Sequence, residues 1–466
     1  MIDEIGSYYR NEMNFQQDLT QQRLTVSIAE LRNLMDTALL PSSMITRSGS
    51  LTGIGPKGLR ANGLSKTVSL GEFVKVNGSS SDFLAEVVQL DFDEIVAKPL
   101  DQNSVAHLGD RVIAIGAPRF YPCEMWKGRI ISALGEPLDG KGPLPQGLVE
   151  ATYNAKPPPA TDRAVISNRL MTGVKTVDIF TPLCYGQRMG VFAGSGVGKS
   201  TLMGMLCRAT GFDCVVVGLI GERGREVNEF VREVLGETLL KAVVVVSTGD
   251  EAASLRKRAA LLATSIAESF RDKGQNVLLI MDSITRFAQA LRELALAGGE
   301  PPVSRGFPPS VFSTLPQMLE RAGPGLDGSG TITGIYSVLV DGDNHNEPIS
   351  DAIRGTLDGH IILDRNTAAS GRYPAIDLLG SISRLINKAL TIEELRISTA
   401  IRSMVIKFEE TKDLRAFGGY QPGKDLELDR AVIAVPKLYA VLNQKPDEQP
   451  CMDPFPMIQS IIGAMR

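Results

Sequence analysis

The stretch 193-AGSGVGKS-200 constrains the fold most, because it fits the phosphate-loop pattern [AG]-x-x-x-x-G-K-[ST]. An apolar, strand-like run (Met189 to Ala193) precedes it, and a helix-like run (Leu202 to Ala209) follows it. Strand, glycine-rich loop and helix in that order are the context that the pattern requires. A glycine-rich turn could match by chance, so the other parts of a nucleotide site must also be present. The stretch predicts an α/β domain that holds phosphate groups.

The residue types within this loop suit a triphosphate. Its glycines let successive backbone N–H groups turn towards phosphate oxygens, and the following helix points the positive end of its dipole at the same place. Lys199 can reach the β- and γ-phosphates, and the Ser200 hydroxyl can bind Mg²⁺. The loop residues expected to bind the nucleotide are Gly194, Ser195, Gly196, Val197, Gly198, Lys199, Ser200 and Thr201.

Length and charge exclude several classes of protein. With 466 residues the chain can form about two to four domains. A net charge of −4, with 49 Lys and Arg against 53 Asp and Glu, disfavours a dedicated nucleic-acid binder. The N-terminus has the early acids Asp3 and Glu4 and no long apolar stretch, so we do not expect it to be a signal peptide, and no apolar run is long enough to span a bilayer. The five scattered cysteines show no metal-ligand spacing. We therefore expect a cytoplasmic protein with free thiols that reaches a membrane only through a partner.

The chain before the core divides into two parts. In residues 1–42, apolar side chains such as Ile28 and Leu31 recur at helical spacing. This segment is either a terminal helix packed on its own domain or an arm that binds a partner, and the pattern leaves both interpretations open. Residues 43–115 alternate short β-rich pieces with Gly, Asn and Ser turns and hold few aromatic residues, which predicts a small β-barrel without a base-stacking platform. The expected strands are Thr67–Leu70, Glu72–Val76, Leu84–Leu90, Glu94–Ala97 and Arg111–Ile115.

Residues 116–385 are expected to form the α/β core. Pro and Gly are frequent in residues 116–160, which indicates a linker leading into it. Apolar runs then alternate with helical patterns, which predicts a parallel sheet covered on both faces. These runs are Met189–Ala193, Val215–Ile220, Ala242–Val246, Val277–Met281, Thr331–Val340 and His360–Leu363. Residues 386–466 predict a C-terminal helical domain. Its apolar faces hold Ile397, Ile401, Met404, Val405 and Phe408, and Val432, Val435, Leu438 and Leu442.

Two carboxylates follow strand-like runs of this core, where ligands of parallel sheets bind. Asp282 ends one run, as expected of the residue that holds the Mg²⁺ shell. Glu222 ends another and could polarise a water for attack on the γ-phosphorus; taken alone, its sequence context favours an exposed charged turn. The transition state also needs positive charge, for which Arg286 and Arg384 are candidates that spacing cannot separate. Arg223 is either a γ-phosphate contact or a solvated side chain.

As a set, these residues resemble the catalytic subunits of rotary ATP synthases and, more closely, the flagellar and type III protein-export ATPases. The order of barrel, core and helical domain also agrees with that family. The matching stretches are 128-GRIISALGEPLDG-140, 193-AGSGVGKST-201, 221-GERGREV-227, 279-LIMDSITRFA-288, 306-GFPPSVF-312, 319-LERAG-323 and 372-RYPAIDLLGSISR-384. The resemblance implies a RecA-type P-loop core that binds ATP and Mg²⁺.

The resemblance also implies roles for single residues. Lys199 and Ser200 match the phosphate and Mg²⁺ ligands, Asp282 matches the Walker B residue, and Glu222 matches the catalytic glutamate, where non-catalytic rotary subunits have Gln. Arg223 and Arg286 match the arginines near the γ-phosphate and its metal shell, and Tyr373 matches the aromatic residue that stacks on adenine. Arg384 matches an arginine finger that reaches a neighbour's site. Such a finger implies a ring, which in the family is a homohexamer.

The implied function is an ATPase of the flagellar export apparatus that delivers or unloads export substrates. Its expected partners are a stator-like regulatory protein at residues 1–42, substrates with their chaperones, and the membrane export gate. It would be cytoplasmic and peripherally associated with the inner-membrane export apparatus. One alternative is the ATPase of a virulence injectisome. Others are a hexameric helicase of the transcription-terminator type, which would need the basic, aromatic nucleic-acid domain that this barrel lacks, and a non-catalytic subunit, which Glu222 disfavours.

Overall fold

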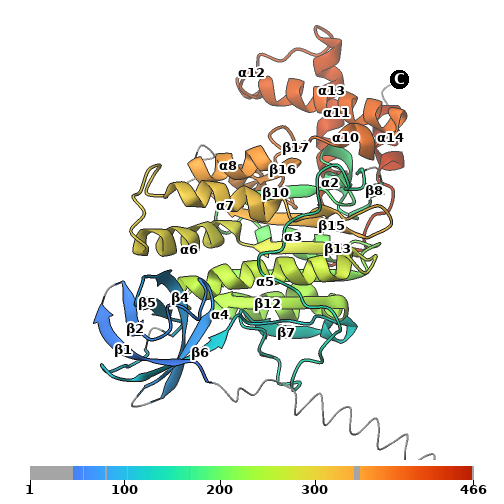
Figure 1. Cartoon of the computed structure of the whole chain (residues 1–466). Coiled ribbons are helices and arrows are strands. Elements are labelled where there is room, and N and C mark those ends of the chain that lie inside the picture. Colours follow the sequence, from blue (N-terminus) through green and yellow to red (C-terminus); the bar gives the residue numbers. More distant parts are fainter. Residues whose placement is uncertain are drawn as a thin grey trace, which may run out of the picture.

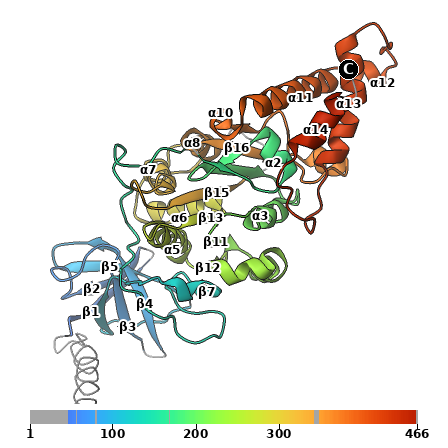
Figure 2. The same ribbon diagram turned by 90° about the vertical axis from the view of Figure 1, so that its right-hand side faces the viewer.

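The computed structural model describes residues 46–55, 57–78, 81–101, 103–166, 168–340 and 347–463. The helical arm expected over residues 1–42 lies outside these ranges. Figures 1 and 2 show a β-barrel at one end, a sheet between helices in the middle, and a group of helices at the other end. Among the described helices, none combines the length and the apolar character needed to cross a bilayer.

The first part is a closed six-stranded barrel. Its strands are joined in the order β1-β2-β5-β4-β3-β6, and β1 closes the barrel by pairing with β6. All neighbours are antiparallel, and alternate side chains point inwards to a small core that includes Val74, Val76 and Ile95. The strands are β1 (Ser48–Gly55), β2 (Gly58–Asn62), β3 (Phe73–Asn77), β4 (Asp82–Leu90), β5 (Glu94–Pro99) and β6 (Arg111–Gly116).

Three strand assignments in the barrel differ from the sequence-based expectation. The strand expected at Thr67–Leu70 is wrong, because the amides of Thr67 and Val68 both donate to the carbonyl of Leu64 and close a turn. The buried Val68 side chain supplies the apolar residue that looked like part of a strand. Strands β1 and β2 were not expected, since β1 is rich in Gly and Ser, which seldom favour strands, and β2 has only five residues and starts with Gly.

The middle part is a nearly parallel sheet, with strand order β17-β16-β10-β15-β13-β11-β12-β7 and β14 paired to β15. Only β17 and β14 run antiparallel to their neighbours. All six apolar runs expected as strands are strands of this sheet. The strands are β7 (Arg129–Ser132), β10 (Arg188–Ala193), β11 (Cys214–Glu222), β12 (Ala242–Thr248), β13 (Asn276–Asp282), β14 (Gly323–Pro324), β15 (Thr331–Leu339), β16 (Gly359–Leu363) and β17 (Ile382–Ser383). A separate pair joins β8 (Arg169–Leu170) to β9 (Leu183–Cys184).

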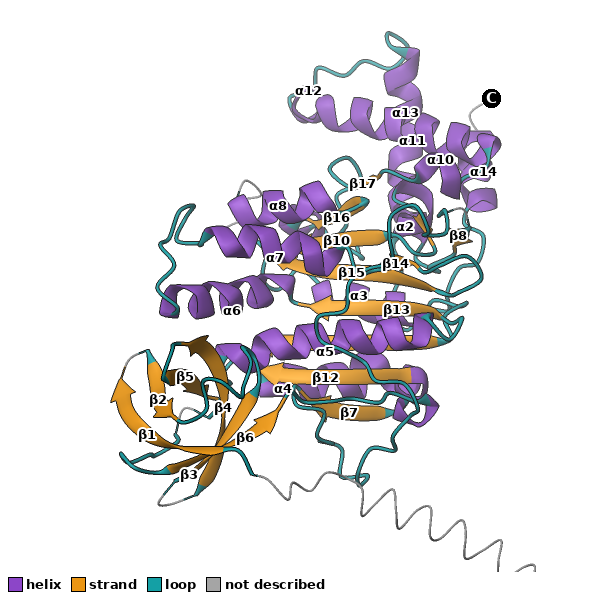
Figure 3. Ribbon diagram, viewed as in Figure 1, coloured by secondary structure: helices purple, strands orange, loops and turns teal. Residues whose placement is uncertain are grey.

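Both faces of the sheet are covered (Figure 3). Along β11, alternate residues enter two different cores: Val215 and Val217 pack on one side, and Cys214 and Val216 on the other. This explains the continuous apolar runs of the sequence. One side holds α2 (Lys175–Phe180), α3 (Lys199–Cys207) and the π-helical turn η2 (Phe230–Leu235). The other holds α5 (Ala253–Arg271), α6 (Ile284–Ala297), α7 (Pro309–Leu319) and α8 (Pro348–Thr356). Shorter helices are η1 (Glu124–Trp126), α4 (Gly224–Glu229), η3 (Gly236–Lys241) and α9 (Arg365–Ala369).

Residues 116–160 are more than the linker that their Pro and Gly content indicated. They contribute β7, which pairs in parallel with β12 and forms one edge of the sheet. An ion pair of 2.7 Å between Arg129 and Asp139 fixes the following turn, and its hydrogen bonds hold the pKa of Asp139 well below its usual range. With only four residues among turn-forming neighbours, β7 gave too short a signal to be recognised.

The last part is helical, as expected. It comprises α10 (Ile386–Ala389), α11 (Ile392–Glu410), α12 (Lys412–Ala416), α13 (Leu426–Leu442) and α14 (Phe455–Gly463). The expected apolar face of α11 packs through Ile401 and Val405 against Val435 and Leu438 of α13. Thr391 and Glu394 form a capping box that starts α11. Apolar side chains of these helices belong to the same hydrophobic cluster as one face of the sheet. This packing fixes the helical part to the α/β core.

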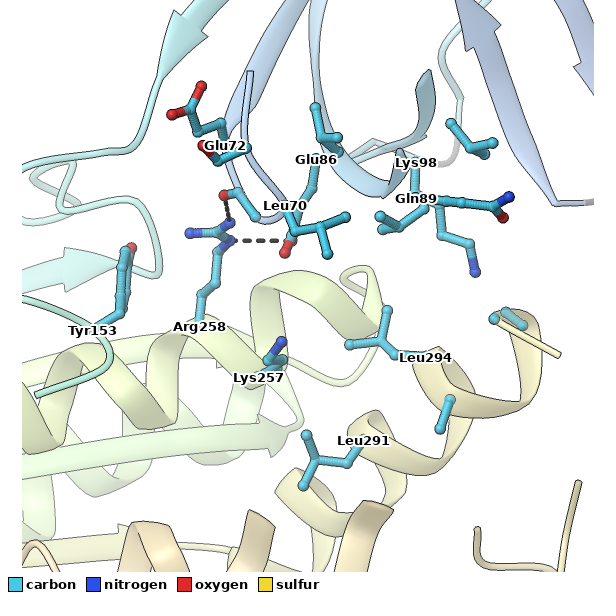
Figure 4. Close-up of a pocket in the computed structure, with 18 of the residues that line it drawn as sticks. Leu70, Glu72, Glu86, Gln89, Lys98, Tyr153, Lys257, Arg258, Leu291 and Leu294 are labelled. Atoms are coloured by element: carbon cyan, nitrogen blue, oxygen red, sulfur yellow. Dashed lines mark hydrogen bonds and ion pairs between the residues drawn. The ribbon is translucent and has the colours of Figure 1, made fainter. Parts of the chain in front are cut away.

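The barrel is joined to the core by a buried guanidinium (Figure 4). Arg258 of α5 forms an ion pair of 3.1 Å with Glu86 of β4 and donates to the carbonyl of Gly71 at 2.6 Å. Its guanidinium also lies over the ring of Phe73, 4.1 Å from the centroid. The two charged side chains are only 7% and 9% exposed, so this contact is part of the interior. It borders a cleft of about 810 Å³ between barrel and core, into which Lys257 also points.

Candidate functional site

The glycine-rich loop connects β10 to the first residue of α3, as the sequence predicted. Gly196 and Gly198 have φ angles of +78° and +94°, which favour glycine, and a Cβ on either would meet no atom within 4 Å. Val197 between them is buried and anchors the loop in the apolar core. The N-cap of α3 is Gly198, which has no side-chain cap, so the first N–H groups of this nine-residue helix are available to an anion. The loop thus has the form of a phosphate cradle, with Ser195, Ser200 and Thr201 exposed along it.

Lys199 and Asp282 meet directly. The Lys199 Nζ lies 2.6 Å from Asp282 Oδ1, and the same oxygen accepts a hydrogen bond of 2.6 Å from the Ser337 hydroxyl. The parallel pairing of β13 with β15 brings Asp282 and Ser337 together. Met281 and Tyr336, the residues just before them, lie opposite each other in the two strands. Burial lowers the pKa of Lys199, but the carboxylates of Asp282 and Glu222 outweigh it, and the pKa stays above its usual value.

Glu222 completes this cluster. Its Oε1 lies 3.6 Å from the Lys199 Nζ and has no hydrogen-bond partner among the described residues. Burial raises the pKa of Glu222 to about 7; Lys199 opposes this rise, and Asp282 and Glu226 add to it. A register shift between Ile220 and Glu222 turns the end of β11, and Gly221 adopts a φ of +72° there. The geometry places a carboxyl group with a raised pKa beside the phosphate loop.

The three candidate arginines lie in different places. Arg286 packs over Gly221, where an added Cβ would come within 2.9 Å of the Arg286 Cβ, so it belongs to the neighbourhood of Glu222. Its Nη1 donates to Gln289 at 3.0 Å, while its buried Nε has no partner among the described residues. Arg223 is 87% exposed, and its ion-pair partner is Glu226 at 4.0 Å rather than a member of the cluster.

Arg384 lies at the amino-terminal ends of the parallel strands β10 and β16, on the side of the sheet away from the phosphate loop. It follows β17, which runs antiparallel to β16, so its amide donates to Asp358 at the start of β16. Asp358 in turn bonds to Arg188, the first residue of β10, whereas the phosphate loop follows the last. Since a strand advances about 3.3 Å per residue, the length of β10 separates Arg384 from its own loop by roughly 17 Å. The exposed Arg384 side chain is therefore remote from Lys199 of the same chain.

Tyr373 lies near the carboxyl ends of the parallel strands, where the phosphate loop also lies. The pairing of Leu363 with Ala193 brings the end of β16 beside the end of β10, and Tyr373 follows α9 just beyond. Its side chain is 47% exposed and lines a shallow pocket with Pro374, Leu442 and Asn443. This position suits a group that would stack on a base of a nucleotide held by the loop.

Sequence reasoning missed two polar neighbours of the cluster. Ser337 was hidden in the apolar run of β15, although a polar side chain in a buried strand is a usable signal. Glu226 lies in the first turn of α4, four residues after Glu222, and interacts with its carboxyl group. A group of three or more His, Cys, Asp or Glu side chains that could bind a metal by themselves is absent from the described residues.

Known proteins match both the core and the helical part. Residues 173–383 match the ATP synthase alpha/beta family, nucleotide-binding domain, and residues 390–454 match the T3SS EscN ATPase C-terminal domain. A flagellum-specific ATP synthase of Rhizobium meliloti (strain 1021) is 49% identical over 440 residues, covering 94% of each chain. The chain belongs to the family of flagellum-specific ATP synthases and type III secretion ATPases. A type 3 secretion system ATPase of Xanthomonas euvesicatoria is 43% identical over 385 residues, covering 82% of this chain and 86% of that protein.

Solved structures of the family have the same architecture. The assembled ATPase EscN of the enteropathogenic E. coli type III secretion system aligns with a TM-score of 0.82 and 40% identity, covering 90% of this chain and all of the other. EscN in complex with its central stalk EscO gives a TM-score of 0.81. The predicted fold class is therefore confirmed, and so is the assignment to an ATP-hydrolysing family. The roles of individual residues stay predictions.

Proposed function

We propose that this chain hydrolyses ATP with Glu222 as the group that readies the attacking water. The observation that carries the proposal is the cluster at the end of the phosphate loop, in which the Lys199 Nζ lies 2.6 Å from Asp282 and 3.6 Å from Glu222. Lys199 and the loop N–H groups would bind the β- and γ-phosphates. The Oε1 of Glu222, which has no hydrogen-bond partner among the described residues, leaves lone pairs for a water beside them.

Electrostatics at Glu222 favour this role. A pKa of about 7 lets the carboxylate accept a proton near neutral pH, where a carboxylate with its ordinary pKa would be a poor base. Arg286, packed over Gly221, would supply positive charge to the developing transition state. The exposed Arg223 would have to change its side-chain conformation to do the same.

The donor set around Asp282 also suits Mg²⁺. This hard cation prefers oxygen ligands and keeps several waters, so it needs few protein groups. The hydroxyl of Ser200 is exposed at the loop, and the buried Asp282 carboxylate is oriented by the Ser337 hydroxyl. When bound, Mg²⁺ would neutralise charge on the β- and γ-phosphate oxygens. Ser200 would bind it, and Asp282 would hold its water shell.

Arg384 would act on a neighbouring subunit. It lies at the amino-terminal ends of the parallel strands, far from its own phosphate loop, and its exposed side chain suits a contact between subunits. The likeness to the assembled ATPase EscN supports an oligomer. We propose a homohexameric ring in which each site lies at a subunit boundary and Tyr373 stacks on the adenine.

In the cell, the protein would serve flagellar protein export and would deliver or unload export substrates. The flagellum-specific relative is more similar and covers more of the chain than the type 3 secretion ATPase of Xanthomonas, which supports the flagellar assignment. The proposed partners are a regulatory stator-like protein at residues 1–42, substrates and their chaperones, and a membrane export gate. The solved complex of EscN with EscO supports a further, stalk-like partner in the ring. The protein would work in the cytoplasm against the inner membrane.

Gene deletion tests this function. A deletion strain should lose flagellar filaments and exported flagellin, and the wild-type gene should restore both. The Glu222→Gln gene, at equal protein level, should restore markedly less. The alternative is an injectisome ATPase, in which case filaments would persist and secretion of virulence proteins would fail. Full restoration by Glu222→Gln would contradict the proposed use of ATP.

A further inference from the structure

The backbone of Tyr373 is held on both sides by the C-terminal helical part. Its amide donates to Asn443 Oδ1 at 3.0 Å, and its carbonyl accepts from the amide of Gln444 at 2.7 Å. Asn443 and Gln444 directly follow Leu442, the last residue of α13. The peptide groups that carry the Tyr373 ring are therefore fixed to the end of this helix.

Gln444 is itself fixed to the core. Its side chain is 2% exposed, and its Oε1 accepts from the amide of Lys175 at 3.0 Å while its Nε2 donates to the carbonyl of Gly173 at 2.9 Å. Lys175 is the first residue of α2 and Gly173 precedes its N-cap; α2 lies beside the C-terminal helices in Figures 1 and 2. The end of α13 thus joins three segments: α2, the C-terminal helices and the segment that carries Tyr373. A satisfied buried amide of this kind fixes one arrangement of its partners.

The ring of Tyr373 is left accessible by this arrangement. The neighbouring ring of Tyr439 makes other contacts, since the Arg372 guanidinium lies 4.0 Å from its centroid and the Tyr439 hydroxyl donates to Glu409 at 2.7 Å. The Tyr373 side chain is 47% exposed, and Asn443 lines the same shallow pocket. A planar group can therefore stack on this ring without displacing a packed neighbour.

We propose that Asn443 and Gln444 are positioning residues that orient Tyr373 for stacking, so that the end of α13 sets the affinity for ATP. The inference rests on the stacking role of Tyr373 in the proposed function. Neither residue takes part in the chemistry at Glu222. Removing one hydrogen bond to the Tyr373 backbone therefore weakens ATP binding and leaves the rate of the chemical step unchanged.

Steady-state ATP hydrolysis by the full chain tests the inference with four variants. Asn443→Ala removes the acceptor, Asn443→Asp keeps an acceptor oxygen in its place, and Tyr373→Ala removes the ring. Gln459→Ala changes another exposed amide of the helical part and is the matched control. Inorganic tripolyphosphate, which carries no base, is used as a competitive inhibitor to report on the phosphate loop alone.

Asn443→Ala should raise KM for ATP by about 3- to 10-fold, the usual effect of one hydrogen bond, with kcat within about twofold of wild type. Asn443→Asp and Gln459→Ala should have wild-type KM, and Tyr373→Ala should raise KM at least as much as Asn443→Ala. The inhibition constant of tripolyphosphate should be equal in all five proteins.

Each other outcome overturns the inference in a recognisable way. Wild-type KM in Asn443→Ala with raised KM in Tyr373→Ala refutes the positioning role and leaves the proposed function intact. Wild-type KM in both variants refutes the stacking role as well. A weakened tripolyphosphate affinity in Asn443→Ala, or an Asn443→Asp variant as impaired as Asn443→Ala, shows damage other than loss of the acceptor and contradicts the proposal.

Discussion

The Nζ of Lys199 lies 2.6 Å from Asp282 Oδ1 and 3.6 Å from Glu222 Oε1. One ammonium group therefore faces the buried Asp282 carboxylate and the partly buried Glu222 carboxylate at the mouth of the phosphate loop. A triphosphate bound there would share the lysine with them, because its oxygens would compete for the same three N–H donors. This shared lysine links phosphate binding to the state of Glu222.

Replacement of Lys199 should abolish tight nucleotide binding. Charge-assisted hydrogen bonds contribute roughly 1.5–3 kcal/mol, so we expect Lys199→Ala to weaken ATP binding by about 10- to 100-fold or more. Isothermal titration calorimetry of the purified chain measures this. Lys57→Ala, which changes an exposed lysine of the barrel, is the control and should bind normally. Unchanged affinity in Lys199→Ala would refute the role of the loop.

The activity should depend on the ionisation of Glu222. Its pKa is raised to about 7, and a general base works only when it is ionised, so kcat/KM for ATP should fall as the pH is lowered through about 7 and level off above it. Below this pH the slope should approach tenfold per pH unit. The residual activity of Glu222→Gln should lack this limb, since it has no carboxyl group to titrate. A wild-type profile without that limb would contradict the assignment.

Two inactive variants should restore each other. Arg384→Ala and Glu222→Gln subunits are each expected to lose most activity, because an arginine finger typically contributes about 10³-fold or more. In mixed rings, some boundaries join an intact Glu222 to an intact Arg384, and activity should rise well above that of either variant alone. Mixing two preparations of the same variant is the control. Absence of any recovery in rings that demonstrably contain both subunits would argue against action across the boundary.

The joint between barrel and core should be sensitive to unpaired charge. Arg258→Met leaves Glu86 buried without its partner, for which we expect a loss of about 3–5 kcal/mol in the free energy of unfolding. The double variant Arg258→Met/Glu86→Leu removes both charges and should be clearly more stable than the single one. Denaturant unfolding measures both. A single variant as stable as the double would show that this pair is not buried in solution.

The sequence was sufficient where one local pattern decides the structure. The phosphate loop, Asp282 and Glu222 could be placed because each ends an apolar run, and parallel strands bring such ends to one edge. The sequence was insufficient where the structure of a segment depends on which other strand it pairs with. The strand β7 has only four residues, which is too short for its pattern to predict a strand. Val68 was predicted to be in a strand but lies in a turn. The choice between Arg286 and Arg384 depends on the reversal at β17, which no spacing reveals.

The most direct test of the central claim is a paired measurement on Glu222→Gln: ATP affinity at equilibrium and ATP turnover in the same preparation. The variant keeps the size of the side chain and the Lys199–Asp282 ion pair, so ATP should bind as tightly as to wild type while turnover falls by about 10²- to 10⁴-fold. Glu229→Gln, an exposed carboxylate of α4, is the control and should hydrolyse ATP normally. Turnover of Glu222→Gln within a few-fold of wild type would contradict the claim that Glu222 readies the water.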